Sequence, residues 1–128
     1  MRCRVLLIED DRNLADGVST ILRMEDLEVF VLHDGRAAVG MVAHVEPDVV
    51  VLDVGLGRIS GIVVGEALRA AWPSLPIIFA TGDADKPELR EVSSRRRMWV
   101  LQKPYEISAL IDMIDHVLNR HEAPTPSN

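Results

Sequence analysis

The stretch VVVLDVGLG, which spans Val49–Gly57, decides how this chain folds. Four apolar residues run without interruption and then meet a single carboxylate, Asp53. An apolar run this short predicts a strand that is buried on both faces of a sheet. A charge at the end of such a strand is unfavourable unless it has a partner or a function, so Asp53 is the first candidate site residue.

The same pattern recurs on both sides of this stretch. Together with residues 48–53, short apolar segments predict strands at 5–8, 28–32, 76–81 and 98–102. Segments with apolar residues at helical spacing separate them and predict helices at 13–24, 35–45, 61–72, 86–97 and 106–120. Five strands that alternate with helices predict an α/β fold, a doubly wound parallel five-stranded sheet with helices on both faces.

Two of the predicted helices carry more detailed expectations. The spacing of apolar residues in 13–24 places four side chains on the buried face, namely Leu14, Val18, Ile21 and Leu22. In the helix at 86–97, Pro87 suits the first turn and Asp85 is the expected N-cap.

Length and composition indicate one domain. The chain has 128 residues, of which 48% are hydrophobic and 27% are charged. We place the domain at residues 1–121 and predict a flexible C-terminal tail at 122–128, which contains prolines and a serine. The net charge of −6 disfavours direct binding to nucleic acid or to an anionic membrane. One cysteine, Cys3, and no apolar stretch of membrane-spanning length favour a cytoplasmic location.

Chemically reactive side chains follow four of the predicted strands. Their strand ends carry Glu9 and Asp10, then Asp53, then Thr81, and finally Lys103. Ligands of such sheets bind beyond the carboxyl ends of the strands, where neighbouring strand ends lie together. We therefore expect a cup of carboxylates with one hydroxyl and one ammonium group.

This set of groups suits phosphoryl transfer. Clustered carboxylates repel one another unless a cation is present, and oxygen ligands suit Mg²⁺. The metal and Lys103 would neutralise phosphoryl oxygens while a carboxylate attacks phosphorus. Asp53, anchored by a buried strand, is the expected nucleophile.

The sequence resembles the receiver domain of bacterial two-component response regulators from Arg4 to about Arg120. The motifs that carry the resemblance are LLIEDD, VVLD with a glycine eight residues after the aspartate, FATG and QKPY. The resemblance implies a flavodoxin-like (βα)5 fold with strand order 2-1-3-4-5. It also implies that a sensor histidine kinase or a histidine phosphotransfer protein donates a phosphoryl group from phosphohistidine. Partners would read the change on the face formed by residues 87–97, 98–101 and 106–120.

The resemblance also implies roles for the acidic residues. Asp53 would accept the phosphoryl group and contribute to a Mg²⁺ site. Asp10 would ligate the metal directly, Glu9 would do so largely through water, and the backbone carbonyl of Gly55 would be a further ligand. Asp11 would only cap the first helix.

Thr81 and Lys103 would contact the phosphoryl group, Thr81 through its hydroxyl and Lys103 through its ammonium group. The bond between Lys103 and Pro104 is often cis in the family. The resemblance implies no turnover of a separate substrate and therefore no enzyme, only self-phosphorylation and self-dephosphorylation at Asp53.

Two positions depart from the family pattern. Gly57 stands four residues after the acceptor, where most receivers have proline, and Val100 replaces an aromatic residue that rotates inward on activation. Trp99 is adjacent, but neighbours along a strand point to opposite faces, so it should not replace that aromatic. PIIFATGD also resembles the PFxFATGxY motif of stand-alone receivers that lack the aromatic, although Ile77 replaces its phenylalanine and Asp83-Ala84 stands in place of Gly-Tyr.

We interpret the chain as a single-domain response regulator, and four alternatives remain at this point. The chain is a receiver fragment of a longer regulator with an output domain, or a receiver-like interaction module that is never phosphorylated. A haloacid-dehalogenase-like phosphohydrolase would need an aspartate at position 55, where glycine stands. A flavin binder of flavodoxin type would need a phosphate-binding loop after the first strand, and Glu9–Asp11 would repel phosphate there.

Overall fold

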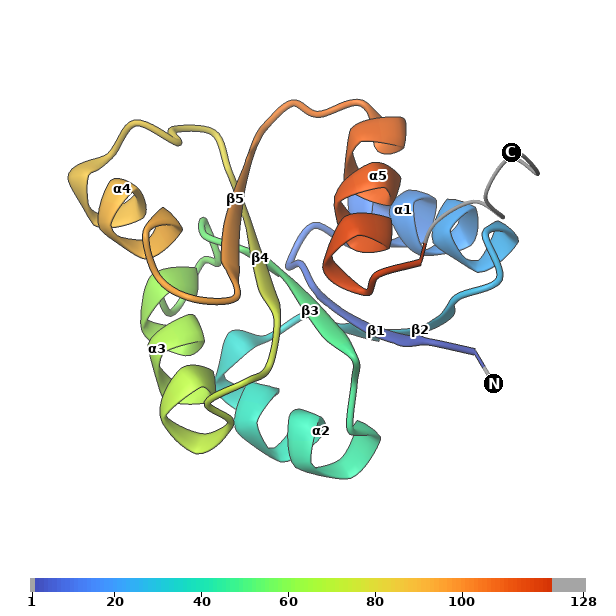
Figure 1. Ribbon diagram of the computed structural model, residues 1–128, viewed down its shortest axis with the longest axis horizontal. Helices are drawn as coiled ribbons and strands as arrows, with labels where there is room; N and C mark the ends of the chain where they lie inside the picture. Colours follow the sequence, from blue (N-terminus) through green and yellow to red (C-terminus); the bar gives the residue numbers. More distant parts are fainter. Residues whose placement is uncertain (1, 121–128) are drawn as a thin grey trace.

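The computed structural model describes residues 2–120 (Figure 1). Its strands are β1 (Arg4–Ile8), β2 (Glu28–Leu32), β3 (Val49–Asp53), β4 (Ile77–Thr81) and β5 (Met98–Gln102). Its α-helices are α1 (Arg12–Met24), α2 (Ala38–Val45), α3 (Gly61–Ala71), α4 (Pro87–Ser93) and α5 (Ile107–Val117). A short 3-10 helix at Gly35–Ala37 leads into α2. The predicted tail at 122–128 and the last residue of the predicted domain lie outside the described residues.

The five strands form one parallel sheet in the order β2-β1-β3-β4-β5, as predicted. In this order β3 is the central strand, between β1 and β4. The register pairs Ile8 with Leu52, Asp53 with Ala80, and Thr81 with Gln102. Because all strands are parallel, the residues that follow β1, β3, β4 and β5 meet at one edge of the sheet.

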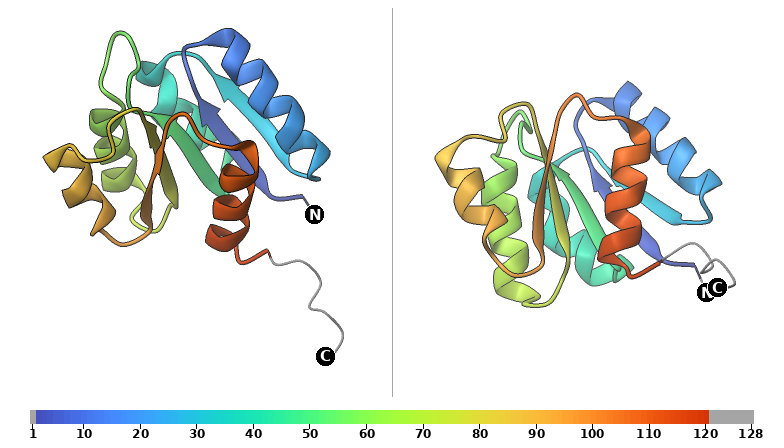
Figure 2. Two further views of the ribbon diagram at one scale, coloured as in Figure 1. Left: turned by 90° about the horizontal axis from the view of Figure 1, so that it is seen from above. Right: turned by 45° about the horizontal axis from the view of Figure 1, so that its top comes forward.

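Helices cover both faces of the sheet. The core on one face includes side chains from α2, α3 and α4, such as Val42, Leu68 and Leu89. The core on the other face includes side chains from α1 and α5, such as Leu22 and Ile114. Figure 1 and the right view of Figure 2 show α1 and α5 on the opposite side of the sheet from α2 and α3.

The position of each strand sets its burial. All five residues of central β3 are buried, including Asp53, whose exposed fraction is only 7%. The outer strand β5 is mostly half-buried. Within β5, Trp99 packs on the α1–α5 face and Val100 on the opposite face, which confirms that these neighbours point in opposite directions.

Two apolar residues of α1 differ from the prediction. Leu14 and Ile21, which were expected to face the core, are each 37% exposed. Ala15 and Ser19 take the buried positions beside Val18. Because Ala15 and Ser19 are small, this face of the helix can lie close to the sheet, and the larger apolar side chains are displaced toward solvent.

The predicted helix at 86–97 is too long, because α4 ends at Ser93. The chain then turns, with Arg97 in a left-handed conformation at φ 61°, and the Arg97 carbonyl accepts a hydrogen bond from the Ile77 amide at 3.0 Å. This bond begins the pairing of β4 with β5, so the chain has left the helix before it reaches Arg97. The N-cap prediction was also wrong: Lys86, not Asp85, occupies the cap position, and its side chain makes no capping bond. Pro87 does start the helix, as expected.

Within residues 2–120, no helix combines the length and the apolar character that a membrane crossing needs.

Candidate functional site

Three carboxylates meet at the carboxyl edge of the sheet. Glu9 and Asp10 follow β1, and Asp53 is the last residue of β3. One carboxylate oxygen from each lies within 4.8 Å of the others. Glu9 and Asp53 are buried, whereas Asp10 is exposed. The cluster therefore has two oxygens anchored in the fold and one at its open side.

Lys103, which follows β5, reaches across the edge of the sheet to this cluster. Its Nζ donates to Oε1 of Glu9 at 3.0 Å and to Oδ1 of Asp53 at 3.2 Å. Burial lowers the pKa of Lys103, but the hydrogen bond to Glu9 and the charges of both carboxylates outweigh burial and raise that pKa above its ordinary value. The ammonium form is therefore favoured at neutral pH.

The surroundings of Glu9 disfavour its charged form. Burial, together with the negative charge of Asp53, raises the pKa of Glu9 above its ordinary value, although the bond from Lys103 acts in the opposite direction. The Asp11 amide also donates to Oε2 of Glu9 at 3.3 Å. Two buried carboxylates and one ammonium group leave the cluster short of positive charge.

Main-chain amides of the loop after β3 hold the other two carboxylates. The Gly55 amide donates to Oδ1 of Asp53 at 3.2 Å, and the Gly57 amide donates to Oδ2 of Asp10 at 3.1 Å. The second bond depends on the departure at position 57, because proline has no N–H to donate. These contacts were not predicted, since residue type can show that a backbone N–H is present but not which carboxylate it bonds.

Gly61, at the start of α3, lets that helix approach Asp53 closely. Its amide donates to the Val54 carbonyl at 2.9 Å. A Cβ at this position would lie only 2.2 Å from the Asp53 carbonyl oxygen, so no other residue fits without a shift of the backbone. The glycine eight residues after the aspartate, which belongs to the motif noted in the sequence, therefore has a steric explanation.

Thr81 is buried, and its hydroxyl accepts a hydrogen bond from the Asp83 amide at 3.1 Å. Thr81, Asp53 and Lys103 line one cavity of about 740 Å³, which opens at the carboxyl edge of the sheet. The structure thus brings together all of the predicted side chains. For Gly55, the recorded contact is its amide on Asp53, so the predicted role of its carbonyl stays a prediction.

Two smaller expectations are confirmed. Asp11 is the N-cap of α1, since its Oδ1 accepts from the Leu14 amide at 3.1 Å. The peptide bond between Lys103 and Pro104 is cis.

The donor set fits a hard divalent cation. The three groups that converge are carboxylates, so the ligands they offer are oxygens, and the group contains no histidine or cysteine. Hard ions such as Mg²⁺ prefer such ligands. The excess of negative charge around Glu9 and Asp53 gives a cation a second reason to bind here.

Comparison with known proteins identifies the family. Residues 5–115 match the model of the response regulator receiver domain. The chain therefore belongs to the receiver domains of two-component response regulators.

Characterised relatives are about twice as long as this chain. The DNA-binding response regulator MtrA of Mycolicibacterium smegmatis is 31% identical over 122 residues, which cover 95% of this chain and 53% of the relative. The response regulator MprA of Mycobacterium bovis is 30% identical over 120 residues, which cover 94% of this chain and 52% of the relative. The chain spans about half the length of the curated relatives it matches.

Solved structures agree with the fold. A CheY-like receiver domain protein of Methanospirillum hungatei superposes with a TM-score of 0.84 at 20% identity and covers 93% of this chain and 95% of that one. The chemotaxis response regulator CheY4 of Vibrio cholerae superposes with a TM-score of 0.81 at 25% identity, over 92% of this chain and all of that one.

Proposed function

We propose that this chain accepts a phosphoryl group on Asp53 and signals by the change that follows. The observation that carries the proposal is the bridge that Lys103 Nζ makes between Asp53 and Glu9. It places a fixed positive charge beside the carboxylate that would accept phosphate, at a cavity that Thr81 also lines. A positive charge beside the acceptor stabilises the transferring phosphoryl oxygens.

In the proposed step, an Asp53 carboxylate oxygen forms a bond to phosphorus. The phosphorus–nitrogen bond of a phosphohistidine on the donor protein breaks, and its electron pair returns to the imidazole, which takes up a proton from solvent. Lys103 exchanges its bond to Asp53 for one to a phosphoryl oxygen, and the Thr81 hydroxyl donates to another. The product is an acyl phosphate that carries roughly −1.5 to −2 charge.

Glu9, Asp10 and Asp53 would hold the metal, with the Gly55 carbonyl as a further ligand. A bound Mg²⁺ would supply the positive charge that offsets the acid cluster and the incoming phosphate. Asp53 is buried and hydrogen-bonded to the Gly55 amide, so the acceptor keeps its orientation before the donor arrives.

The donor we propose is a sensor histidine kinase or a histidine phosphotransfer protein in the cytoplasm. The chain would act as a substrate and switch rather than as an enzyme, because each phosphoryl group stays on its own Asp53 until hydrolysis. Downstream proteins would read the face formed by α4, β5 and α5. Two observations support this face: the loop from Thr81 leads directly into α4, and Lys103 directly follows β5.

Incubation with acetyl phosphate and Mg²⁺ tests the proposal, with intact mass as the measurement. The wild-type chain should gain one phosphate, and Asp53→Asn, which keeps the size of the side chain, should gain none. Asp10→Asn is expected to slow uptake without moving the site of the adduct. Phosphate on Asp53→Asn, or no adduct on the wild type at any Mg²⁺ concentration, would refute the assignment.

A second candidate is the same receiver function within a longer regulator. The length of the relatives favours it, since MtrA is described as DNA-binding and this chain covers only 53% of it. The structure of CheY4, which this chain covers in full length, supports the stand-alone alternative. The sequence of the native gene beyond codon 128 distinguishes the two.

A further inference from the structure

The side chain of Gln102, the last residue of β5, reaches across to the loop that joins β4 to α4. Its Nε2 donates to the Gly82 carbonyl at 2.7 Å, and its Oε1 accepts from the Ala84 amide at 2.9 Å. The same Nε2 donates to the carbonyl of Lys103 at 2.9 Å. One amide group therefore holds the loop on both sides of Asp83.

Asp83, between these two held residues, is tied to the candidate site. Its amide donates to the Thr81 hydroxyl at 3.1 Å, and Thr81 is paired with Gln102 in the register of β4 and β5. Figure 1 and Figure 2 show the loop after β4 and the loop after β5 at the same end of the sheet. The Thr81 hydroxyl and the Gln102 amide thus hold the same three-residue segment from two directions.

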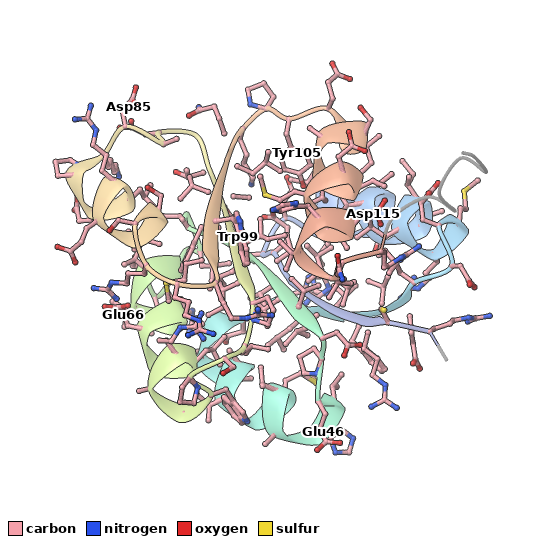
Figure 3. All side chains as sticks on the ribbon, in the orientation of Figure 1. Glu46, Glu66, Asp85, Trp99, Tyr105 and Asp115 are labelled. Carbon is pink, nitrogen blue, oxygen red and sulfur yellow. The ribbon has the colours of Figure 1, made fainter. Side chains whose placement is uncertain are left out.

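The position where receivers usually carry a mobile aromatic holds only Val100 here. Trp99, which Figure 3 labels on β5, packs on the α1–α5 face and so lies across the sheet from Val100. A ring rotation at position 100 is therefore unavailable to this chain. At the carboxyl end of β5, it is the side chain of Gln102 that bonds to the loop at 82–84.

We propose that Gln102 is a positioning residue that restrains this loop in the unphosphorylated protein, and that release of its bond to Ala84 reports phosphorylation to α4. When the Thr81 hydroxyl turns toward a phosphoryl group on Asp53, it draws the Asp83 amide with it. That movement carries Ala84 away from Gln102. Since α4 begins at Pro87, three residues after Ala84, the displacement passes directly to the helix.

The inference rests on the proposed function, because it describes the regulation of the same site. We call this restraint the brake. The bonds of Gln102 stabilise the loop at 82–84 in its unphosphorylated conformation, so their loss should favour the conformation that follows phosphorylation, which we call the switched loop. In the switched loop the Thr81 hydroxyl already faces Asp53, so a larger population of that loop before phosphorylation should speed uptake in proportion.

Gln102→Leu tests the brake, since leucine has a similar size and no amide. We expect it to take up phosphate from acetyl phosphate about fivefold faster than wild type, the effect of losing roughly one net hydrogen bond. Hydrogen exchange at the Ala84 amide, measured without phosphate, should accelerate by a similar factor.

Two further variants bracket this result. Gln102→Asn, one methylene shorter, should take up phosphate at a rate between those of wild type and Gln102→Leu, because its amide cannot span both loop residues. Glu46→Gln, at the exposed C-cap of α2 and outside both the site and the α4–β5–α5 face, is the control and should behave as wild type.

The result separates the two proposals. If the wild type itself takes up no phosphate, the proposed function and the brake both fail. If the wild type is phosphorylated but Gln102→Leu matches it or is slower, the brake is overturned and the proposed function stands. A purely structural role for Gln102 would slow uptake and lower the melting temperature, whereas the brake predicts faster uptake.

Discussion

The two sides of the candidate site are built differently. The acid side consists of Glu9, Asp10 and Asp53, on the ends of β1 and β3. The switch side consists of the loop at 81–84 and of Gln102, on the ends of β4 and β5. The acid side stands on the central strands of the sheet, whereas the switch side lies where β5 forms the outer edge.

The bonds on the two sides differ in the same way. Asp53 is buried and accepts a bond from a main-chain amide, so the fold restrains its orientation. The loop at 82–84 is held mainly by exposed bonds from one flexible side chain, and it leads into a helix of only seven residues. Local stability falls where buried contacts are few. We therefore infer that the acid side stays in place when the phosphoryl group adds its charge, and that the loop on the switch side moves in response.

Gly61→Ala should have the largest effect, because it breaks the acid side through the backbone. The added Cβ would lie 2.2 Å from the Asp53 carbonyl oxygen, so α3 and β3 must separate. We expect a loss of about 3 kcal/mol in the free energy of unfolding, measured with urea. Gly17→Ala is the control: nothing lies within 4 Å of a Cβ there, and alanine in a helix should stabilise by about 0.5–1 kcal/mol. A loss below about 1 kcal/mol for Gly61→Ala would show that the backbone beside Asp53 can shift at little cost.

Lys103→Met should have the next largest effect, because Lys103 joins the two sides. It leaves Glu9 and Asp53 without their shared ammonium group, at an expected loss of about 1–3 kcal/mol in the free energy of unfolding. Millimolar Mg²⁺ should restore more stability to the variant than it adds to wild type, since the cation replaces the missing charge.

Arg95→Met is the control for this prediction. Arg95 forms ion pairs with Glu66 and Glu91 between α3 and α4, on the exposed surface. Such exposed pairs contribute little to stability because water screens them, and the variant should show no extra response to Mg²⁺. Equal Mg²⁺ responses in wild type and Lys103→Met would contradict a shared cation requirement at the acid side.

The raised pKa of Glu9 predicts a pH dependence of stability. In the unfolded chain this carboxyl loses its proton near pH 4.5, and in the folded protein it does so at higher pH. Between these two values the folded state binds more protons, so the contribution of Glu9 to stability is greatest below pH 4.5 and is lost as pH rises through the folded pKa. Glu9→Gln should remove this slope, which is at most about 1.4 kcal/mol per pH unit. Urea midpoints across pH 4–7 measure it, and parallel curves for both proteins would disprove it.

Gly57→Pro should have the smallest effect, and it tests the hydrogen bond from the Gly57 amide to Asp10. It removes the amide that holds Oδ2 of Asp10, so the carboxylate loses its orientation before metal binds. We expect the affinity for Mg²⁺, measured by calorimetry, to fall about threefold. Gly57→Ala keeps the amide, and its Cβ would make only ordinary contact with Asp10 at 3.5 Å, so it should bind as wild type. Identical affinities for the two variants would show that this bond does not matter.

Much of the site was predictable because of how parallel sheets are built. Side chains at the carboxyl ends of parallel strands lie at one edge of the sheet, so the sequence alone predicts that Asp53, Asp10 and Lys103 lie together. The end of α4 was not predictable from helical spacing, because it depends on the Arg97 carbonyl pairing with Ile77 of another strand. The buried face of α1 also depended on how closely Ala15 lets the helix approach the sheet.

The sequence by itself determined the alternation of strands and helices and the chemical groups at the strand ends, because apolar periodicity and residue type are local properties. Only the tertiary structure decided which main-chain amides hold Asp10 and Asp53, and that Gln102 bonds to a loop 18 and 20 residues earlier in the chain. Such bonds join groups that any residue carries, or groups far apart along the chain. Their formation therefore depends on distances that exist only after the sheet has assembled.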